Sequence, residues 1–150
     1  MKKVEGILRE QNRHAATFHN IEEHTPISGI RVGVDALKKS GADIVVSIGG
    51  GSPIDASKAI IYFLQEQLGG EFLRHIAIPT TLSAAEYTVQ YDTQGRLTDV
   101  LTSRKIFTGY TDEARQKKHL RSPYLAPSGI ILDAELTLAT PERLWSVTPW

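Results

Sequence analysis

Apolar and polar positions follow one another along this chain in a pattern typical of alternating helices and strands. Apolar residues three or four apart, set among charged ones, predict helices. Short apolar runs rich in β-branched residues and bounded by glycine or proline predict strands buried on both faces of a sheet. The pattern predicts helices over residues 2–14, 29–41 and 53–70 and a last one begun at 142, and strands over 42–51, 74–81 and 128–141.

The ends of these elements carry their own signals. Gly41 follows the second helix, where a glycine takes the left-handed conformation that ends helices. Pro53 stands near the first turn of the third helix, and glycines follow its end. Residues 16–28 predict a short strand and a loop closed by Pro26. We expect helix 2–14 to face solvent.

Strands that alternate with helices imply right-handed crossovers and a parallel sheet. The predicted fold class is therefore α/β, a Rossmann-like parallel sheet with flanking helices. Ligands of such sheets bind at the carboxyl ends of the strands. Residues 49–52 and 79–83 each follow directly on a strand, so we expect both segments at the functional edge.

Composition narrows the classes of partner. The formal net charge is zero and the basic residues are scattered, which favours neither nucleic acid nor an anionic membrane as partner. No apolar run approaches the ~18 residues of a membrane helix, so we expect a cytoplasmic protein. Cysteine is absent, which leaves five histidines and the carboxylates as the candidate metal ligands.

Three consecutive glycines stand between the strand over 42–51 and the helix that follows it. A helix start offers free backbone N–H groups and the positive end of the helix dipole, and glycine lets a phosphate approach the backbone closely. Ser52 adds a hydroxyl and Asp55 lies one turn into the helix, where it can cap amides or accept a hydrogen bond from a ligand. The alternative is a plain tight turn, because the loop is neither a G-x-G-x-x-G fingerprint nor a Walker loop.

Three segments together point to a family: "SIGGGSPIDASKAI" (47–60), "IAIPTTLSAAEYT" (76–88) and "GIILDAELTLATPERLW" (129–145). In this order and spacing they resemble the iron-containing alcohol dehydrogenase family, most closely its maleylacetate reductase-like branch, over roughly residues 32–147. The resemblance implies the N-terminal nucleotide-binding domain of the dehydroquinate synthase-like fold, with NAD or NADP as cofactor. It does not separate NAD from NADP.

The resemblance also assigns residues to the dinucleotide. The first loop would hold the pyrophosphate, with Asp55 near the ribose or nicotinamide, through Gly49, Gly50, Gly51 and Ser52. The second loop and later positions would line the rest of the cofactor: Thr80, Thr81, Ser83, Thr88, Lys117 or Lys118, and Leu136 beside the adenosine. The alternative for the lysines is a solvated hairpin tip. Glu86 is expected to cap or brace the loop, and Asp133 to be structural.

The resemblance further implies what this chain does not contain. In the family a divalent metal, iron or zinc, is held by one aspartate and three histidines of a helical second domain. The histidines of this chain match none of those positions, and we expect surface or core roles for His14, His19, His24, His75 and His119. We therefore predict no metal ligand and no catalytic residue here. Residues 1–150 would form one NAD(P)-binding domain without its first strands and without the metal-binding domain.

Residues 89–107 depart from the family pattern and are predicted to be an insertion. The overlapping residues 87–101, taken alone, predict an extra β-ribbon around a Gln-Gly turn. A sheet that lacks strands exposes an edge, which favours pairing with another chain and hence a homo-oligomer.

Two functions stay open. The first is the cofactor half of an NAD(P)-dependent, metal-containing alcohol dehydrogenase or maleylacetate reductase-like enzyme, which moves hydride between nicotinamide and a small alcohol or carbonyl substrate. The second is a catalytically inactive nucleotide-binding or interaction module. Dehydroquinate synthase-like or glycerol dehydrogenase-like chemistry shares the architecture, but the second and third segments are closer to the reductase branch.

Overall fold

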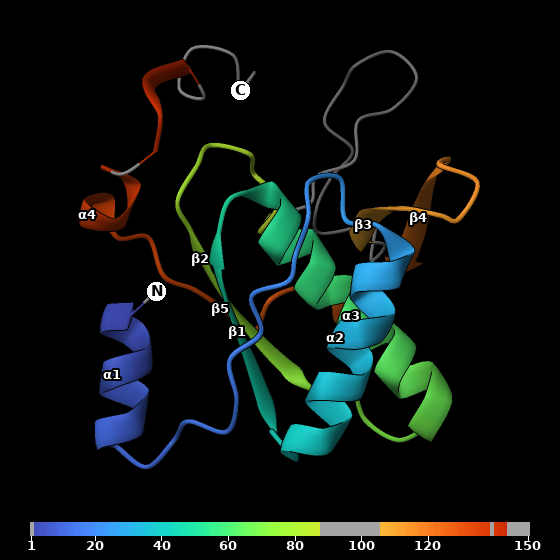
Figure 1. Ribbon diagram of the computed structural model, residues 1–150, viewed down its shortest axis with the longest axis horizontal. Coiled ribbons are helices and arrows are strands. Elements are labelled where there is room, and N and C mark those ends of the chain that lie inside the picture. The colour runs from blue at the N-terminus through green and yellow to red at the C-terminus, as the bar shows by residue number, and fades with distance from the viewer. Residues whose placement is uncertain (1, 88–105, 139, 144–150) are drawn as a thin grey trace.

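A parallel sheet of three strands lies between two groups of helices. The computed structural model describes residues 2–87, 106–138 and 140–143. The sheet has the order β1-β2-β5 and consists of β1 (Ile44–Gly49), β2 (Arg74–Pro79) and β5 (Gly129–Ile130). On one side of it lie α1 (Lys2–Glu10) and α4 (Ala134–Thr137), and on the other α2 (Ile27–Ser40) and α3 (Gly51–Leu68) (Figure 1). The predicted parallel α/β architecture is confirmed.

The register of β1 and β2 decides where their loops meet. The two strands are parallel, with Ile44 opposite Arg74 and Gly49 opposite Pro79. They therefore end side by side, and the backbone N–H of Thr80 donates to the carbonyl of Gly49 at 2.8 Å, one step beyond the ladder. Helix α3 connects the strands as the crossover. The two predicted loops consequently leave the sheet at the same edge.

The apolar core lies between α2 and α3. It is built from Ile30, Val34, Ala59, Ile60 and Leu64. A Cβ on Gly33 of α2 would clash with the Ile60 side chain, so glycine at this position lets the two helices approach closely. Burying each large aliphatic side chain contributes about 1.5–3 kcal/mol, so this contact holds α3 against α2.

An antiparallel hairpin packs against α3 from the outside. It consists of β3 (Ile106–Thr111) and β4 (Lys117–Ser122) and leads into the 3-10 helix η1 (Pro123–Leu125). Tyr110 of β3 meets Phe63 of α3 edge to face, with ring centroids 5.8 Å apart, and Tyr124 stacks on Phe72 at 5.0 Å. The predicted ribbon and most of the predicted insertion, 89–107, lie outside the described residues, and β3 begins at Ile106.

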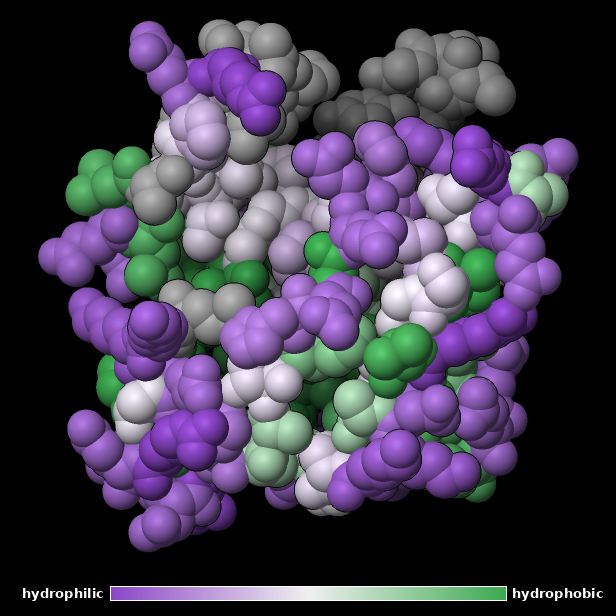
Figure 2. Space-filling view, viewed as in Figure 1, coloured by the Kyte–Doolittle hydropathy of each residue, from purple (hydrophilic) through white to green (hydrophobic). Residues whose placement is uncertain are grey.

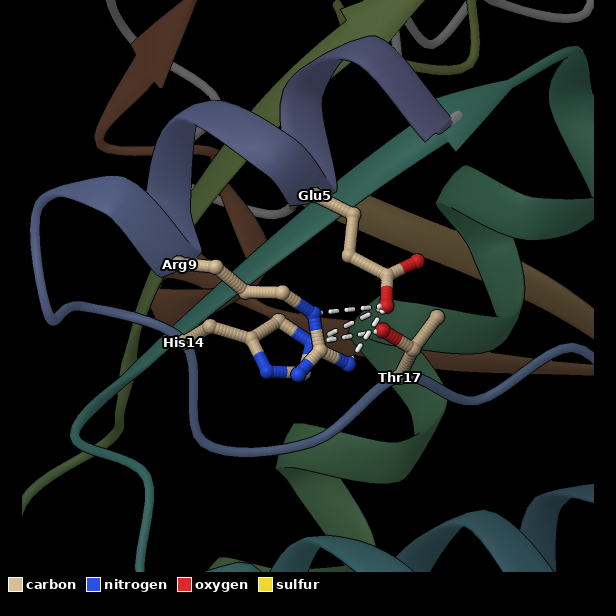
Figure 3. Close-up of polar contacts among 4 residues, drawn as sticks. All are labelled: Glu5, Arg9, His14 and Thr17. Carbon is tan, nitrogen blue, oxygen red and sulfur yellow. Dashed lines mark hydrogen bonds and ion pairs between the residues drawn. The ribbon is translucent and has the colours of Figure 1, made fainter.

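Helix α1 ends earlier than residue 14, the predicted end. Asn12 adopts a left-handed conformation (φ 53°), and the N–H of Arg13 donates to the carbonyl of Leu8 at 2.8 Å, which is a Schellman stop. A polar cluster then fixes the following segment (Figure 3). Arg9 Nη2 donates to Glu5 Oε1 at 2.6 Å, and His14 Nε2 lies 2.7 Å from Thr17 Oγ1. His14 Nε2 also lies 3.8 Å from Glu5 Oε1, which holds the segment near α1.

Two predicted strands were wrong in whole or part. Residues 16–28 contain only an isolated bridge, Pro26 to Thr111, before α2 begins. The strand predicted over 128–141 is two residues long, because Asp133 caps α4: its Oδ1 accepts from the N–H of Glu135 at 2.9 Å. The structural role expected of Asp133 is confirmed. Of the helix predicted from 142, only its first two residues are described.

The surface is mostly hydrophilic on the face shown in Figure 2, with apolar residues gathered near α4 at the left edge. Large apolar side chains exposed beyond β5 and directly after α4 include Ile131, Leu132 and Leu138. Among the residues that the structure describes, no helix combines the length and the apolarity needed to cross a membrane.

Candidate functional site

The first loop of the site is the junction of β1 and α3. Gly49 has φ +145°, and a Cβ there would lie 2.8 Å from the Pro53 Cγ, so only glycine fits without strain. Gly50 is the N-cap of α3 and has no side chain with which to accept from the first-turn N–H groups. Those N–H groups and the positive end of the dipole of α3 therefore meet at this loop, as an anion site requires.

The second loop lies directly against the first. A Cβ on Gly50 would sit 3.2 Å from Cγ2 and Oγ1 of Thr81, and a Cβ on Gly51 would sit 3.2 Å from Cβ and Oγ of Ser83. Glycine at these two positions thus allows the loops to lie this close together. The structure brings together Gly50, Gly51, Thr81 and Ser83, four of the residues assigned to the dinucleotide.

Thr80 and Ser52 anchor the two loops to their surroundings. Thr80 accepts at its carbonyl from the hydroxyl of Thr140, which follows α4, and donates its N–H to Gly49. The carbonyl of Ser52 accepts from the hydroxyl of Thr25 at 3.5 Å. Thr25 in turn accepts at its carbonyl from the N–H of Thr111 at 3.0 Å, which links the hairpin to the first loop.

Asp55 points toward the hairpin. The hydroxyl of Thr108 on β3 donates to Asp55 Oδ1 at 2.8 Å and also reaches the Asp55 carbonyl at 3.0 Å. Burial raises the pKa of Asp55, and the Thr108 hydrogen bond acts in the opposite direction. The contacts of this carboxylate are therefore those of a brace between α3 and β3, and its role toward a cofactor stays a prediction.

Three of the remaining assigned residues lie on other elements. Lys117 and Lys118 are exposed on β4, and Lys118 Nζ donates to Gln116 Oε1 at 3.0 Å and lies 3.5 Å from Asp112 Oδ2. Both lysines thus lie exposed on the hairpin, and their role toward a cofactor stays a prediction. Leu136 is half-buried on α4. Thr88 lies outside the described residues.

The sequence identified only part of a buried polar cluster near the two loops: Glu86 was expected to brace the loop, but Lys58 was missed. Lys58 on α3 is 1% exposed, and its Nζ donates to the carbonyl of Ala85 at 2.5 Å. Glu86 is 5% exposed, and its Oε2 has no hydrogen-bond partner among the described residues. The available signal for Lys58 was a lone lysine within the apolar run of α3, one turn after Asp55.

His75 on β2 is a core histidine, one of the two roles expected of it. It is 3% exposed, and its Nε2 lies 2.7 Å from Oγ of Ser47 on β1. Burial lowers its pKa to about 4, helped by the charge of Lys58, so the ring is neutral near pH 7. Within the described ranges, no group of three or more His, Cys, Asp or Glu residues is placed to hold a metal ion.

The sequence profile of one family, "Iron-containing alcohol dehydrogenase", matches residues 1–108. The chain belongs to the iron-containing alcohol dehydrogenase family. Maleylacetate reductase of Rhizobium sp. (strain MTP-10005) is 34% identical over 127 residues, 85% of this chain and 29% of that protein. NADPH-dependent butanol dehydrogenase of Clostridium saccharobutylicum is 26% identical over 148 residues, 97% of this chain and 37% of that protein.

Solved structures agree with this family membership. A crystal structure of maleylacetate reductase from the same Rhizobium strain superposes with a TM-score of 0.67 at 30% identity, covering 93% of this chain and 34% of the solved one. Sulfoacetaldehyde reductase from Bifidobacterium kashiwanohense, solved in complex with NAD+, gives a TM-score of 0.72 at 21% identity, covering 95% and 37%, which supports the fold alone. This member of the iron-containing alcohol dehydrogenase family spans about a third of the length of these relatives.

Proposed function

We propose that this chain is the dinucleotide-binding part of an NAD(P)-dependent oxidoreductase of the iron-containing alcohol dehydrogenase family, acting on a small alcohol or carbonyl compound of the maleylacetate reductase-like kind. The observation that carries the proposal is the close approach of the two loops at the start of α3. Gly50 and Gly51 face Thr81 and Ser83 there, at the positive end of α3.

The residues present suit a pyrophosphate. Backbone N–H groups at the start of α3 are donors for its oxygens, and the hydroxyls of Thr81 and Ser83 add donors from the opposite side. Glycine leaves the backbone at the start of α3 accessible beside the second loop, since a Cβ at either position would crowd Thr81 or Ser83. When bound, the nicotinamide ring would supply the hydride chemistry, and this chain would bind and orient the cofactor.

No metal ligand is assigned to this chain. The described residues offer no group of His, Cys, Asp or Glu suited to a metal ion, so the metal of the family does not fit the donors at hand. The proposal accordingly covers cofactor binding by these residues, and no reaction step is derived through a metal.

The test is a titration of the purified chain with NADH and with NADPH, followed by nicotinamide fluorescence. In Gly50→Asp a carboxylate would meet both the pyrophosphate and the Thr81 side chain. We expect this change to weaken binding about a hundredfold or more, because a charged hydrogen bond worth about 1.5–3 kcal/mol is replaced by repulsion.

The matched control is Gly6→Asp. A Cβ at Gly6 of α1 meets no other atom within 4 Å, and the substitution adds the same charge outside the loops. Equal affinities of Gly6→Asp and the unmodified chain would locate the effect at the first loop. If the unmodified chain binds neither cofactor, or if Gly50→Asp binds as well as Gly6→Asp, the proposal is wrong.

A further inference from the structure

The buried lysine beneath the site connects the two loops. Lys58 lies on α3, one turn after Asp55 and within two turns of the first loop, and its Nζ donates to the carbonyl of Ala85. Ala85 belongs to the second loop, and its Cβ lies 3.8 Å from the position of a Cβ on Gly51. The amine thus fixes the second loop at the point where it passes the first.

Two carboxylates favour the charged form of this buried amine. Asp55 on α3 and Glu86 in the second loop both act on Lys58 to favour its protonated form. Burial acts more strongly in the opposite direction and lowers the pKa of Lys58 to about 8. A lysine buried only for packing would be replaced at less cost by an apolar residue, so the burial of this amine together with the two acids that favour its charge indicates a role for the charge.

We propose that Lys58 is a positioning residue: its buried ammonium group, through the hydrogen bond to the carbonyl of Ala85, keeps residues 80–86 against the first loop and so maintains the loop arrangement that binds the dinucleotide pyrophosphate. The part of this inference that concerns affinity rests on the proposed function. The part that concerns the loop stands on the hydrogen bond to Ala85 and on the burial of Lys58.

The loop is tested without any ligand, by amide hydrogen exchange at a fixed pH. In Lys58→Met the amides of residues 80–87 should exchange about tenfold faster or more, because a hydrogen bond from a charged donor is lost. Lys58→Arg keeps the charge and should restore slow exchange. Lys38→Met, which removes an exposed lysine of α2, is the matched control and should leave this segment unchanged.

The pH profile separates positioning from mere stability. Other titratable groups near Lys58 are Asp55 on its own helix, His75 on β2, Glu86 in the second loop and, acting on Asp55, His119 of β4. His75, with a pKa of about 4, stays neutral above pH 7. A change in NADH affinity near pH 8 that Lys58→Arg abolishes therefore belongs to Lys58.

As the pH rises, the free energy of unfolding and the NADH affinity should change in opposite directions. The pKa of Lys58 lies at about 8 in the folded chain against 10.5 for an unperturbed lysine, so its contribution to the free energy of unfolding rises with pH between these values. Its ammonium charge disappears over the same range, so NADH affinity should fall about tenfold between pH 7 and pH 9.5. In Lys58→Arg the affinity should be flat, since arginine stays protonated.

Two results would overturn the inference: unchanged exchange of residues 80–87 in Lys58→Met, or the same pH profile of affinity in Lys58→Arg as in the unmodified chain. If Lys58→Met does not fold, the arginine variant still decides through its pH profile. If the unmodified chain binds neither cofactor, the proposed function and the affinity part fail together. Hydrogen exchange then still shows whether Lys58 holds the loop.

Discussion

The two halves of α3 are both buried, yet they are buried with different chemistry. Residues 51–58 include Ser57 and Lys58 among their buried side chains, and Asp55 braces this half against β3. Residues 59–68 bury Ala59, Ile60, Ile61 and Leu64 instead. The second half anchors the helix through apolar contacts, and the first half keeps polar groups in place next to the proposed cofactor site.

This difference separates what holds the fold from what shapes the site. Apolar contacts are insensitive to pH and direction, whereas buried hydrogen bonds and charges fix particular atoms and respond to protonation. Substitutions in the second half should therefore change stability alone. Substitutions around the first half should show pH dependence.

The largest effect is expected for Ile60→Ala. Ile60 belongs to the α2–α3 core and is 6% exposed, so truncation should lower the free energy of unfolding by about 2–5 kcal/mol. Urea unfolding followed by circular dichroism measures this. Ile7→Ala is the control, since Ile7 is 51% exposed on α1 and should cost far less. Equal losses in the two variants would contradict the assignment of the core to the second half of α3.

A slightly smaller effect is expected for the loss of stability in acid that His75 causes and that His75→Gln should remove. The folded-state pKa of His75, about 4, lies below its ordinary value of 6.5, so the folded chain binds fewer protons between these values and loses stability as the pH falls. The loss should reach roughly 3 kcal/mol once the pH is below the folded-state pKa.

His75→Gln cannot titrate and should lack this loss, which urea unfolding at pH 7 and pH 4 would show. His19→Gln changes an exposed histidine and should retain it. An acid loss that persists unchanged in His75→Gln would contradict the neutral, buried state of this ring.

A moderate effect is expected for Thr108→Val. The variant removes the donor to Asp55 and should cost about 1–3 kcal/mol near pH 7, because a buried carboxylate loses its hydrogen bond. Burial already raises the pKa of Asp55, and the variant should raise this pKa further. The stability lost in Thr108→Val should therefore be smaller at pH 4, where the carboxyl is more often protonated.

Thr108→Ser retains the hydroxyl and should restore most of the stability. A deficit in Thr108→Val that is equal at pH 7 and pH 4 would show that packing, rather than the hydrogen bond to Asp55, is the reason for it. Paired urea titrations at the two pH values decide between these cases.

The smallest effect is expected for Tyr124→Ala, in η1. Its ring stacks on Phe72 but remains 66% exposed, so the free energy of unfolding should fall by only about 0.5–1.5 kcal/mol, and Tyr124→Phe should behave like the unmodified chain. Thermal unfolding measures the change. Any accompanying loss of NADH affinity would argue against the separation of stability from the site.

The strongest sequence patterns were those that depend on neighbours in the chain. The predictions for α2, β1, α3 and β2 agree with the structure to within two or three residues at each end, because helical spacing, β-branched runs and glycine stops act locally. The segment 128–141 failed because its apolar residues suit a strand as well as a short capped helix. Asp133 resolved that choice through a single hydrogen bond.

The site shows the same division. The position of the first loop could be inferred from its amino-acid sequence alone. Glycine's freedom in backbone conformation and the dipole of the following helix are local properties. The partners of Lys58 and Asp55 could not, because Ala85 is 27 residues from Lys58 and Thr108 is 53 from Asp55. Such pairs meet only when strands and helices have packed. Burial then makes each unpartnered charge costly, and the fold selects the partners.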